Sequence, residues 1–223
     1  LDLGSQLNSF KKFSDKTRTK KLNTASLKNF RKEKDILKEG KIQDAIKSGD
    51  HLMLQVSKEP ISSKGPRLSG EISFAGRYMV MIPFSERVSI SQKIKSSEEK
   101  SRLKKLIHSI KPKGFGVIIR TVAEGKKVAE LDTDMKNLYK KWQIIFKKLK
   151  TANLNERIHG EMNRSSVILR DLLNSEFSKI HVNSPEIHEE LKEYLSRISP
   201  DQEKIVKLYK GKTPIFQKMN ITQ

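Results

Sequence analysis

The sequence predicts an α+β or mixed α/β fold. Apolar residues at helical spacing over 97–110 and 128–149 alternate with segments rich in β-branched residues, such as 115–122. A second alternation of the same kind follows between residues 164 and 209. The 223 residues suffice for one or two compact domains with a sizeable apolar core.

The first 50 residues differ from the rest in composition. The stretch NSFKKFSDKTRTKKLNTASLKNFRKEKD carries ten lysines or arginines and few apolar residues. Such a composition predicts a mobile basic insertion. Further along, residues 42–46 suggest one helical turn and residues 52–56 a strand. A basic loop and two more strands follow, and Gly76 opens the second of these strands.

Two helices are predicted in the middle of the chain. Glu98 and Glu99 stand in the first turn of the 97–110 segment, where the helix dipole favours negative charge, and Pro112 stops the helix. The helix at 128–149 has the clearest pattern, with apolar residues at Val128, Leu131, Met135, Leu138, Trp142, Ile145 and Leu149. Residues 115–122 between these helices are expected to form a strand.

The last third of the chain repeats the alternation on a smaller scale. Residues 164–173 predict a helix, and residues 178–182 predict a strand. Ser184 and Pro185 then mark the start of another helix, as N-cap and first helical residue. Residues 205–209 complete the pattern with a strand.

The charge of the chain indicates its class of partner. The net charge is +20, which favours a polyanion such as nucleic acid or an anionic membrane surface. The absence of cysteine excludes disulfides, thiolate zinc sites and cysteine nucleophiles. No apolar run is long enough to span a bilayer and no signal peptide opens the chain, so we expect a cytoplasmic protein without membrane insertion. Because the chain begins at Leu1, we also expect it to be a fragment.

The residues offer no recognisable catalytic centre. The G-x-S-x-G, P-loop and H-E-x-x-H motifs are all absent, and the five histidines are scattered. Asp132 and Asp134 are two positions apart on a predicted helix, so they point in different directions and are expected to face solvent. We therefore predict neither a catalytic residue nor a metal ligand in this chain.

Arg120 and Thr121 stand where a predicted strand ends before a glycine-containing turn. A guanidinium can bind phosphate through two parallel hydrogen bonds, and a neighbouring hydroxyl can donate a third. Lys126 and Lys127 add positive potential at the start of the next helix. These residues suggest a phosphate site. The alternative is that Arg120 only marks the exposed end of the strand, and the residues alone leave both interpretations open.

Further basic and aromatic residues suggest contacts with nucleic acid. Lys64 and Arg67 belong to a loop that suits backbone phosphates, although such loops also occur as plain solvated surface. Phe74, Tyr78 and Phe84 alternate with basic residues and are expected either to stack on bases or to lie in the core. Binding to a membrane surface is the weakest alternative, because the apolar residues within 11–34 have uneven spacing.

Three blocks of sequence resemble a known family. KEPISSKGPRLSGEISFAGRYMVMIPFSERVSISQKI, GVIIRTVAEGKK and KIVKLYKGKTPIF are similar, in order and spacing, to the ribonuclease E/G family of bacterial endoribonucleases, and most like its ribonuclease G-type members from Bacteroidetes-like bacteria. The resemblance implies that residues 1–75 are the C-terminal part of an OB-fold β-barrel with the basic insertion. Residues 76–161 would be a 5′-sensor αβ subdomain, and residues 162–223 part of a ribonuclease H-like αβ subdomain.

The resemblance also implies a function. The full protein would cleave single-stranded RNA during RNA processing and decay, and this region would bind RNA and sense a 5′-monophosphate. Arg120 and Thr121 match the phosphate-binding pair of the family, and Gly76 and Val80 match the residues that complete that pocket. Lys64 matches a lysine of the OB-fold domain that contacts RNA.

Two departures from the family pattern matter. A basic residue expected near the sensor is Gln92 here, followed by Lys93, which we take as a candidate RNA contact together with Arg67. The catalytic carboxylates of the family belong to an Asp-x-Asn-Ser motif that this sequence lacks. We therefore expect the Mg²⁺ of the full-length enzyme to be bound beyond Gln223. We also expect the full-length enzyme to be an assembly of identical subunits. The alternative function is a non-catalytic RNA-binding module that contacts backbone phosphates only.

Overall fold

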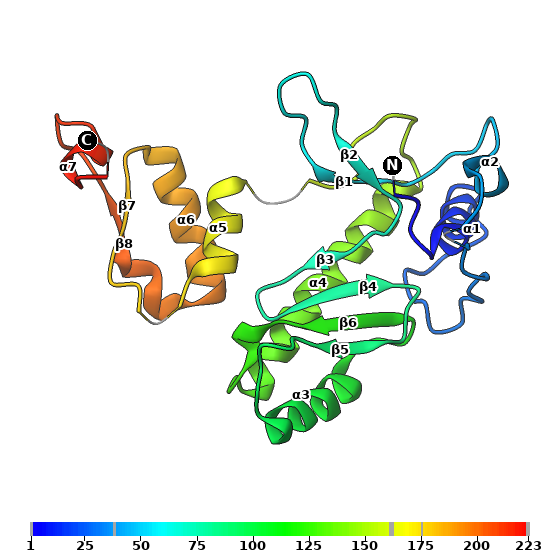
Figure 1. Cartoon of the computed structure of the whole chain (residues 1–223), viewed down its shortest axis with the longest axis horizontal. Coiled ribbons are helices and arrows are strands. Elements are labelled where there is room, and N and C mark those ends of the chain that lie inside the picture. The colour runs from blue at the N-terminus through cyan, green and yellow to red at the C-terminus, as the bar shows by residue number, and fades with distance from the viewer. Residues whose placement is uncertain (1, 38, 161–162, 175, 222–223) are drawn as a thin grey trace. The chain divides into compact units, whose positions relative to one another are not determined.

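The computed structural model describes residues 2–37, 39–160, 163–174 and 176–221 (Figure 1). The chain divides into two compact units, Leu1–His159 and Gly160–Gln223. Within the described residues the strands form three sheets, none of which closes into a barrel, so the fold is mixed α/β. The boundary expected between 161 and 162 lies outside the described residues. The boundary at 75/76 and the OB-fold, 5′-sensor and ribonuclease H-like assignments remain predictions.

A mixed sheet forms the centre of the first unit. Its strands lie in the order β3-β4-β6-β5 (Figure 1), with the bounds Phe74–Ala75 for β3, Met79–Pro83 for β4, Val88–Ile90 for β5 and Phe115–Ile119 for β6. Strand β4 pairs antiparallel with both β3 and β6, whereas β5 runs parallel to β6. The carboxyl ends of β5 and β6 therefore lie at the same edge of the sheet.

Two helices cover one face of this sheet. Helix α3 (Ser97–Ile110) contacts β5, and α4 (Val128–Leu149) contacts β3 and β4. On the covered face Met79, Val117 and Ile119 are fully buried, whereas Val80 and Ile118, which are paired in register, belong to the opposite face and are partly exposed. Both helices match the predicted ranges.

The strand predicted at 115–122 is shorter in the structure. It ends at Ile119, and a 3-10 turn, η1 (Thr121–Ala123), follows. The backbone N–H of Arg120 still donates to the carbonyl of Tyr78 at 2.8 Å. The β-branched residues beyond Ile119 therefore continue the sequence pattern of a strand without continuing the ladder.

The prediction of a mobile insertion over residues 1–50 is wrong for its first part. Helix α1 (Leu7–Arg18) places Phe10 and Phe13 in the core, each at most 1% exposed. The ring of Phe13 lies 4.7 Å from that of Trp142 on α4, measured between centroids. The indole N–H of Trp142 donates to the carbonyl of Ala25 at 2.7 Å. The few apolar residues of the segment suffice to dock it on α4.

Along the chain, a short helix and a hairpin come between α1 and the central sheet. Helix α2 (Ile42–Ala45) confirms the predicted helical turn. Strands β1 (Gln55–Lys58) and β2 (Arg67–Ser69) pair antiparallel, with an irregularity between Val56 and Lys58. The first strand was predicted about three residues too early. The connection between β1 and β2 is exposed throughout, from Glu59 to Pro66.

The second unit is a small βαβ arrangement. It contains α5 (Arg164–Leu172), β7 (Ile180–Val182), α6 (Pro185–Ile198), η2 (Pro200–Ile205), β8 (Val206–Leu208) and α7 (Ile215–Lys218). Strands β7 and β8 are parallel, which requires the crossover that α6 and η2 supply. The hydroxyl of Ser184 accepts a hydrogen bond from the N–H of Ile187 at 3.3 Å, so the predicted N-cap is confirmed.

We expect Trp142→Phe to lower the free energy of unfolding by about 1–3 kcal/mol, because the buried carbonyl of Ala25 would lose its donor. Urea unfolding followed by circular dichroism measures this. Ile144→Ala on the same helix is the control, since Ile144 is 45% exposed, and should stay within about 0.5 kcal/mol of wild type. Equal effects of the two substitutions would show that the N-terminal segment is not docked through Trp142.

Candidate nucleic-acid interface

Arg120 is held between the end of β6 and the turn that precedes β4. Its backbone N–H donates to the carbonyl of Tyr78 at 2.8 Å, and its Nη1 donates to the carbonyl of Gly76 at 3.0 Å. The side chain is partly buried. Arg120 therefore lies at the end of the β4–β6 ladder, where one carbonyl of the turn binds its backbone and another binds its guanidinium.

Thr121 lies beside the end of the parallel strand β5. Its hydroxyl shares a hydrogen bond of 3.0 Å with the hydroxyl of Ser91, the residue after β5. Two residues later, the N–H of Lys93 donates to the same Ser91 oxygen at 3.4 Å, and the Lys93 side chain is exposed. Gln92 is also exposed in this turn. The structure thus brings Lys93 and Thr121, which are distant in sequence, to one edge of the sheet.

Gly76 begins the turn that holds Arg120. Gly76 is buried, and its N–H donates to the carbonyl of Met79 at 2.8 Å. A Cβ atom at this position would lie only 2.5 Å from Oδ2 of Asp134. Val80, two residues after Tyr78, lies on the partly exposed face of β4. A hydrogen bond therefore links Arg120 to Gly76, and Thr121 follows Arg120 directly in the chain. Val80 belongs to the same corner of the sheet.

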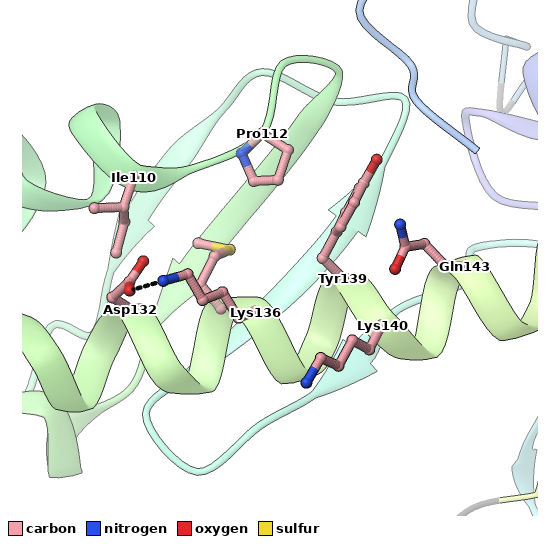
Figure 2. Close-up of a pocket in the computed structure, with 8 residues that line it drawn as sticks. Ile110, Pro112, Asp132, Lys136, Tyr139, Lys140 and Gln143 are labelled. Atoms are coloured by element: carbon pink, nitrogen blue, oxygen red, sulfur yellow. Dashed lines mark ion pairs between the residues drawn. The ribbon is translucent and has the colours of Figure 1, made fainter. Parts of the chain in front are cut away.

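The prediction that both aspartates of α4 face solvent is half wrong. Asp132 pairs with Lys136 on the surface at 2.6 Å, as Figure 2 shows. Asp134 instead accepts hydrogen bonds from the backbone N–H groups of Arg77 at 3.2 Å and Tyr78 at 2.9 Å. Burial raises the pKa of Asp134, although these backbone hydrogen bonds act in the opposite direction.

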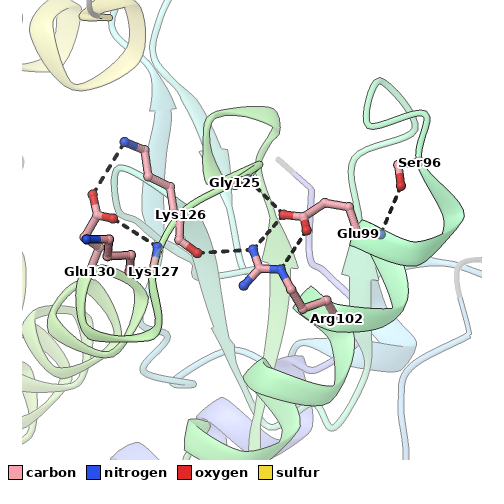
Figure 3. A network of polar contacts seen from close by, with 7 residues as sticks. All are labelled: Ser96, Glu99, Arg102, Gly125, Lys126, Lys127 and Glu130. Atoms are coloured by element: carbon pink, nitrogen blue, oxygen red, sulfur yellow. Dashed lines mark hydrogen bonds and ion pairs between the residues drawn. The ribbon is translucent and has the colours of Figure 1, made fainter.

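The loop after Arg120 is fastened to the start of α3 (Figure 3). The carboxylate of Glu99 accepts two hydrogen bonds from Arg102, at 2.6 and 2.7 Å, and one from the N–H of Gly125 at 2.9 Å. Arg102 also donates to the carbonyl of Lys126 at 3.1 Å. The hydrogen bonds from Arg102 and Gly125 lower the pKa of Glu99 to about 2. This network limits the freedom of the segment that follows Thr121.

Lys126 and Glu130 lie next to Tyr78. The Lys126 ammonium is 5.8 Å from the centre of the Tyr78 ring and 3.5 Å from a Glu130 oxygen, and the Tyr78 hydroxyl donates to Glu130 at 3.2 Å. The positive charge predicted at the start of α4 is present, but Glu130 partly compensates it (Figure 3). Lys127 is exposed, and its N–H donates to Glu130 at 3.0 Å.

The aromatic residues proposed for base stacking lie in the core instead. Phe74 is 5% exposed, Tyr78 7% and Phe84 3%. The ring of Phe84 packs edge-on against Phe10 at 4.7 Å between centroids. Because α1 and α4 bury these rings, the stacking alternative is wrong for all three.

Lys64 and Arg67 lie on a different element, the exposed β1–β2 hairpin. Lys64 closes a tight bend through reciprocal backbone hydrogen bonds with Ile61, at 3.0 and 3.1 Å. Arg67 begins β2 and, like Lys64, is exposed.

The remaining features of the surface are of other kinds. A groove of about 280 Å³ lies between the residues that follow α3 and the outer side of α4 (Figure 2), lined by Ile110, Pro112, Asp132, Met135, Lys136, Tyr139, Lys140 and Gln143. Among the described residues, no three histidine or acidic side chains gather as metal ligands. No helix in the described ranges is long and apolar enough to cross a membrane.

Sequence reasoning did not predict the contacts that Asp134, Glu99 and Ser91 make in support of the site. One signal was available for Asp134. Glu130 and Asp134 are four residues apart, so they share a side of α4, immediately beside the apolar residues Leu131 and Met135. Two acidic residues beside a stripe of buried apolar residues indicate that their carboxylates bind other groups of the protein rather than facing solvent.

The fold and the site define a mixed α/β protein with a cationic corner suited to an anionic ligand. The sequence profile of the Ribonuclease E/G family matches residues 73–223. Ribonuclease G of Escherichia coli (strain K12) is 34% identical over 180 residues, which cover 81% of this chain and 37% of that protein. Ribonuclease E of Synechocystis sp. (strain PCC 6803) is 35% identical over 156 residues, covering 70% of this chain and 23% of that protein.

The chain belongs to the ribonuclease E/G family, so the family predicted from the sequence is confirmed. Ribonuclease G of Haemophilus influenzae (strain Rd) agrees, at 33% identity over 175 residues that cover 78% of this chain and 36% of that protein. The chain thus spans little more than a third of the length of these ribonuclease G relatives.

We expect Glu99→Gln to lower the free energy of unfolding by about 1 kcal/mol at neutral pH, a value reduced for the partial exposure of the pair. Because the pKa of Glu99 is lowered from 4.5 to about 2, the stabilisation is complete above pH 4.5 and declines as pH falls toward 2. Urea unfolding of wild type and variant at a series of pH values measures it. Glu98→Gln, in the same exposed turn, is the control, and a difference independent of pH would contradict the prediction.

Proposed function

We propose that this chain is the RNA-binding and 5′-monophosphate-sensing region of an endoribonuclease that cleaves single-stranded RNA in RNA processing and decay. The observation that carries the proposal is the position of Arg120 and Thr121, adjacent at the carboxyl ends of two parallel strands, with the guanidinium held by Gly76. Membership of the ribonuclease E/G family supports RNA as the ligand.

The 5′-phosphate would bind at this corner through charge and directed hydrogen bonds. A guanidinium has five N–H donors in a planar fork, a geometry that suits phosphate oxygens, and one of these donors binds the Gly76 carbonyl. The Thr121 hydroxyl, 3.0 Å from that of Ser91, is a second donor. An RNA with a 5′-hydroxyl lacks the anionic oxygens that these donors would recognise, which is the basis of selectivity.

The rest of the RNA would be bound through its backbone. Lys93 is exposed beside Thr121, and Lys64 and Arg67 are exposed on the β1–β2 hairpin. The net charge of +20 supplies a general attraction that depends on salt concentration. In this proposal these lysines and arginines contribute affinity, and Arg120 contributes recognition of the 5′ end.

Cleavage itself would depend on other parts of the full-length protein. Magnesium would activate a water molecule for attack on the phosphodiester, and the described residues contain no cluster suited to bind it. We further propose that the full-length protein is cytoplasmic and assembles from identical subunits. The residues described here would hold one end of the substrate.

A second candidate is a non-catalytic RNA-binding module that contacts backbone phosphates without recognising an end. The exposed basic hairpin with Lys64 and Arg67 favours it. This alternative predicts strong salt dependence and equal affinity for all 5′ ends.

We expect Arg120→Ala to weaken binding of a short 5′-monophosphorylated RNA by about 10- to 100-fold, because charge-assisted hydrogen bonds contribute about 1.5–3 kcal/mol. Affinity for the same RNA with a 5′-hydroxyl should stay within about twofold. Fluorescence anisotropy with the full-length protein measures both. The control is Arg87→Ala, an exposed arginine of the same unit. If the wild-type protein binds both RNAs equally, the end-sensing proposal fails and the second candidate gains.

Substitution of Lys64 by alanine tests the backbone contacts. We expect affinity to fall for both RNAs by the same factor, and the slope of log K against log salt to decrease by about one. Titrations at several salt concentrations measure this. Lys20→Ala, which removes an equally exposed lysine elsewhere, should leave the slope closer to wild type. A change confined to the 5′-monophosphorylated RNA would contradict the assignment of Lys64.

A further inference from the structure

We propose that Asp134 is a positioning residue for the 5′-phosphate site, an inference that rests on the proposed function. In this proposal its carboxylate holds residues 76–79 in the one arrangement that fixes Arg120. Asp134 itself does not contact the RNA. It acts through the backbone of the turn.

The N–H groups of the turn converge on Asp134. Oδ1 accepts from Arg77 at 3.2 Å and Oδ2 accepts from Tyr78 at 2.9 Å, and the backbone of Met79 contributes a third hydrogen bond. A carboxylate has two acceptor oxygens, so it can satisfy N–H groups on both sides at once. An asparagine would turn its NH₂ group toward one of these donors. The turn therefore requires a carboxylate rather than an amide at this position.

The carbonyl groups of the same turn point to Arg120. The carbonyl of Gly76 accepts from the guanidinium at 3.0 Å, and that of Tyr78 accepts from the backbone N–H of Arg120 at 2.8 Å. The peptide groups of the turn thus present donors to Asp134 and acceptors to Arg120. A shift of the turn away from Asp134 would move both acceptors, and Arg120 would lose its fixed position.

The packing of Gly76 supports the same role. An added Cβ would lie 2.5 Å from Oδ2, 2.7 Å from Oδ1 and 2.8 Å from Cγ of Asp134. All three of its nearest atoms would belong to this one carboxyl group. Glycine at this position is thus explained by the close approach of Asp134. A buried carboxylate is stable only where hydrogen bonds compensate its desolvation, so the turn and the carboxylate depend on each other.

The experiment compares the preference for 5′-monophosphorylated over 5′-hydroxyl RNA in the full-length wild type and its variants. We expect Asp134→Asn to reduce the preference at least fivefold, while affinity for 5′-hydroxyl RNA stays within about twofold. Gly76→Ala should act in the same direction. Asp132→Asn, two positions away in the exposed pair with Lys136, is the matched control and should keep the full preference.

The double variant Gly76→Ala/Asp134→Ala distinguishes positioning from general destabilisation. Removal of the carboxyl group makes space for the new Cβ, so the loss of preference in the double variant should be clearly smaller than the sum of the losses in Gly76→Ala and Asp134→Ala measured singly. Thermal unfolding of each variant shows that it is folded. Should Asp134→Asn not fold, Gly76→Ala, which displaces the turn and keeps the carboxylate, gives the decisive measurement.

The measured preferences and affinities decide the inference. Loss of preference in folded variants, with affinity for 5′-hydroxyl RNA retained, supports it. Full preference in folded Asp134→Asn or Gly76→Ala overturns it, as does an equal loss of affinity for both RNAs. If the wild type shows a preference that depends on Arg120 and Asp134→Asn keeps it, only this inference fails. If the wild type shows no preference, the proposed function fails as well.

Discussion

The pairing of β4 with β6 is the constraint on which the rest of the site depends. It sets Val80 opposite Ile118 and Met79 opposite Ile119, and its continuation places Tyr78 opposite Arg120. A slip of one residue would exchange the two faces of the strand, burying Arg120 or exposing the core. The apolar face against α3 and α4 prevents that slip, so packing of the core also fixes where the guanidinium stands.

The elements that the sequence predicted well are those governed by local rules. Helices α3 and α4 follow from regular apolar spacing, and α6 from Ser184 and Pro185. The position of Arg120 and Thr121 at a strand end also followed from local pattern, because a glycine-containing turn comes directly after them. Their proposed role in binding an RNA 5′ end came instead from the resemblance to the family.

The features that were missed depend on partners far away in the chain. Asp134 accepts a hydrogen bond from the backbone of Tyr78, 56 residues earlier, and Trp142 donates one to the carbonyl of Ala25, 117 residues earlier. Neither contact leaves a pattern within a window of sequence. The basic N-terminal segment was misjudged for a related reason. Its composition resembles that of mobile chains, yet Phe10 and Phe13 are enough to dock it once α4 supplies a complementary surface.

That docking has a consequence for how the protein can be shortened. The aromatic rings of Phe13, Phe84 and Trp142 form one continuous cluster drawn from three separate stretches of chain. Deletion of the lysine-rich N-terminal segment would expose a hydrophobic surface on α4, the helix that carries Asp134. Truncated forms would then tend to aggregate, and any loss of the proposed RNA binding in them would reflect a disrupted core rather than missing positive charge.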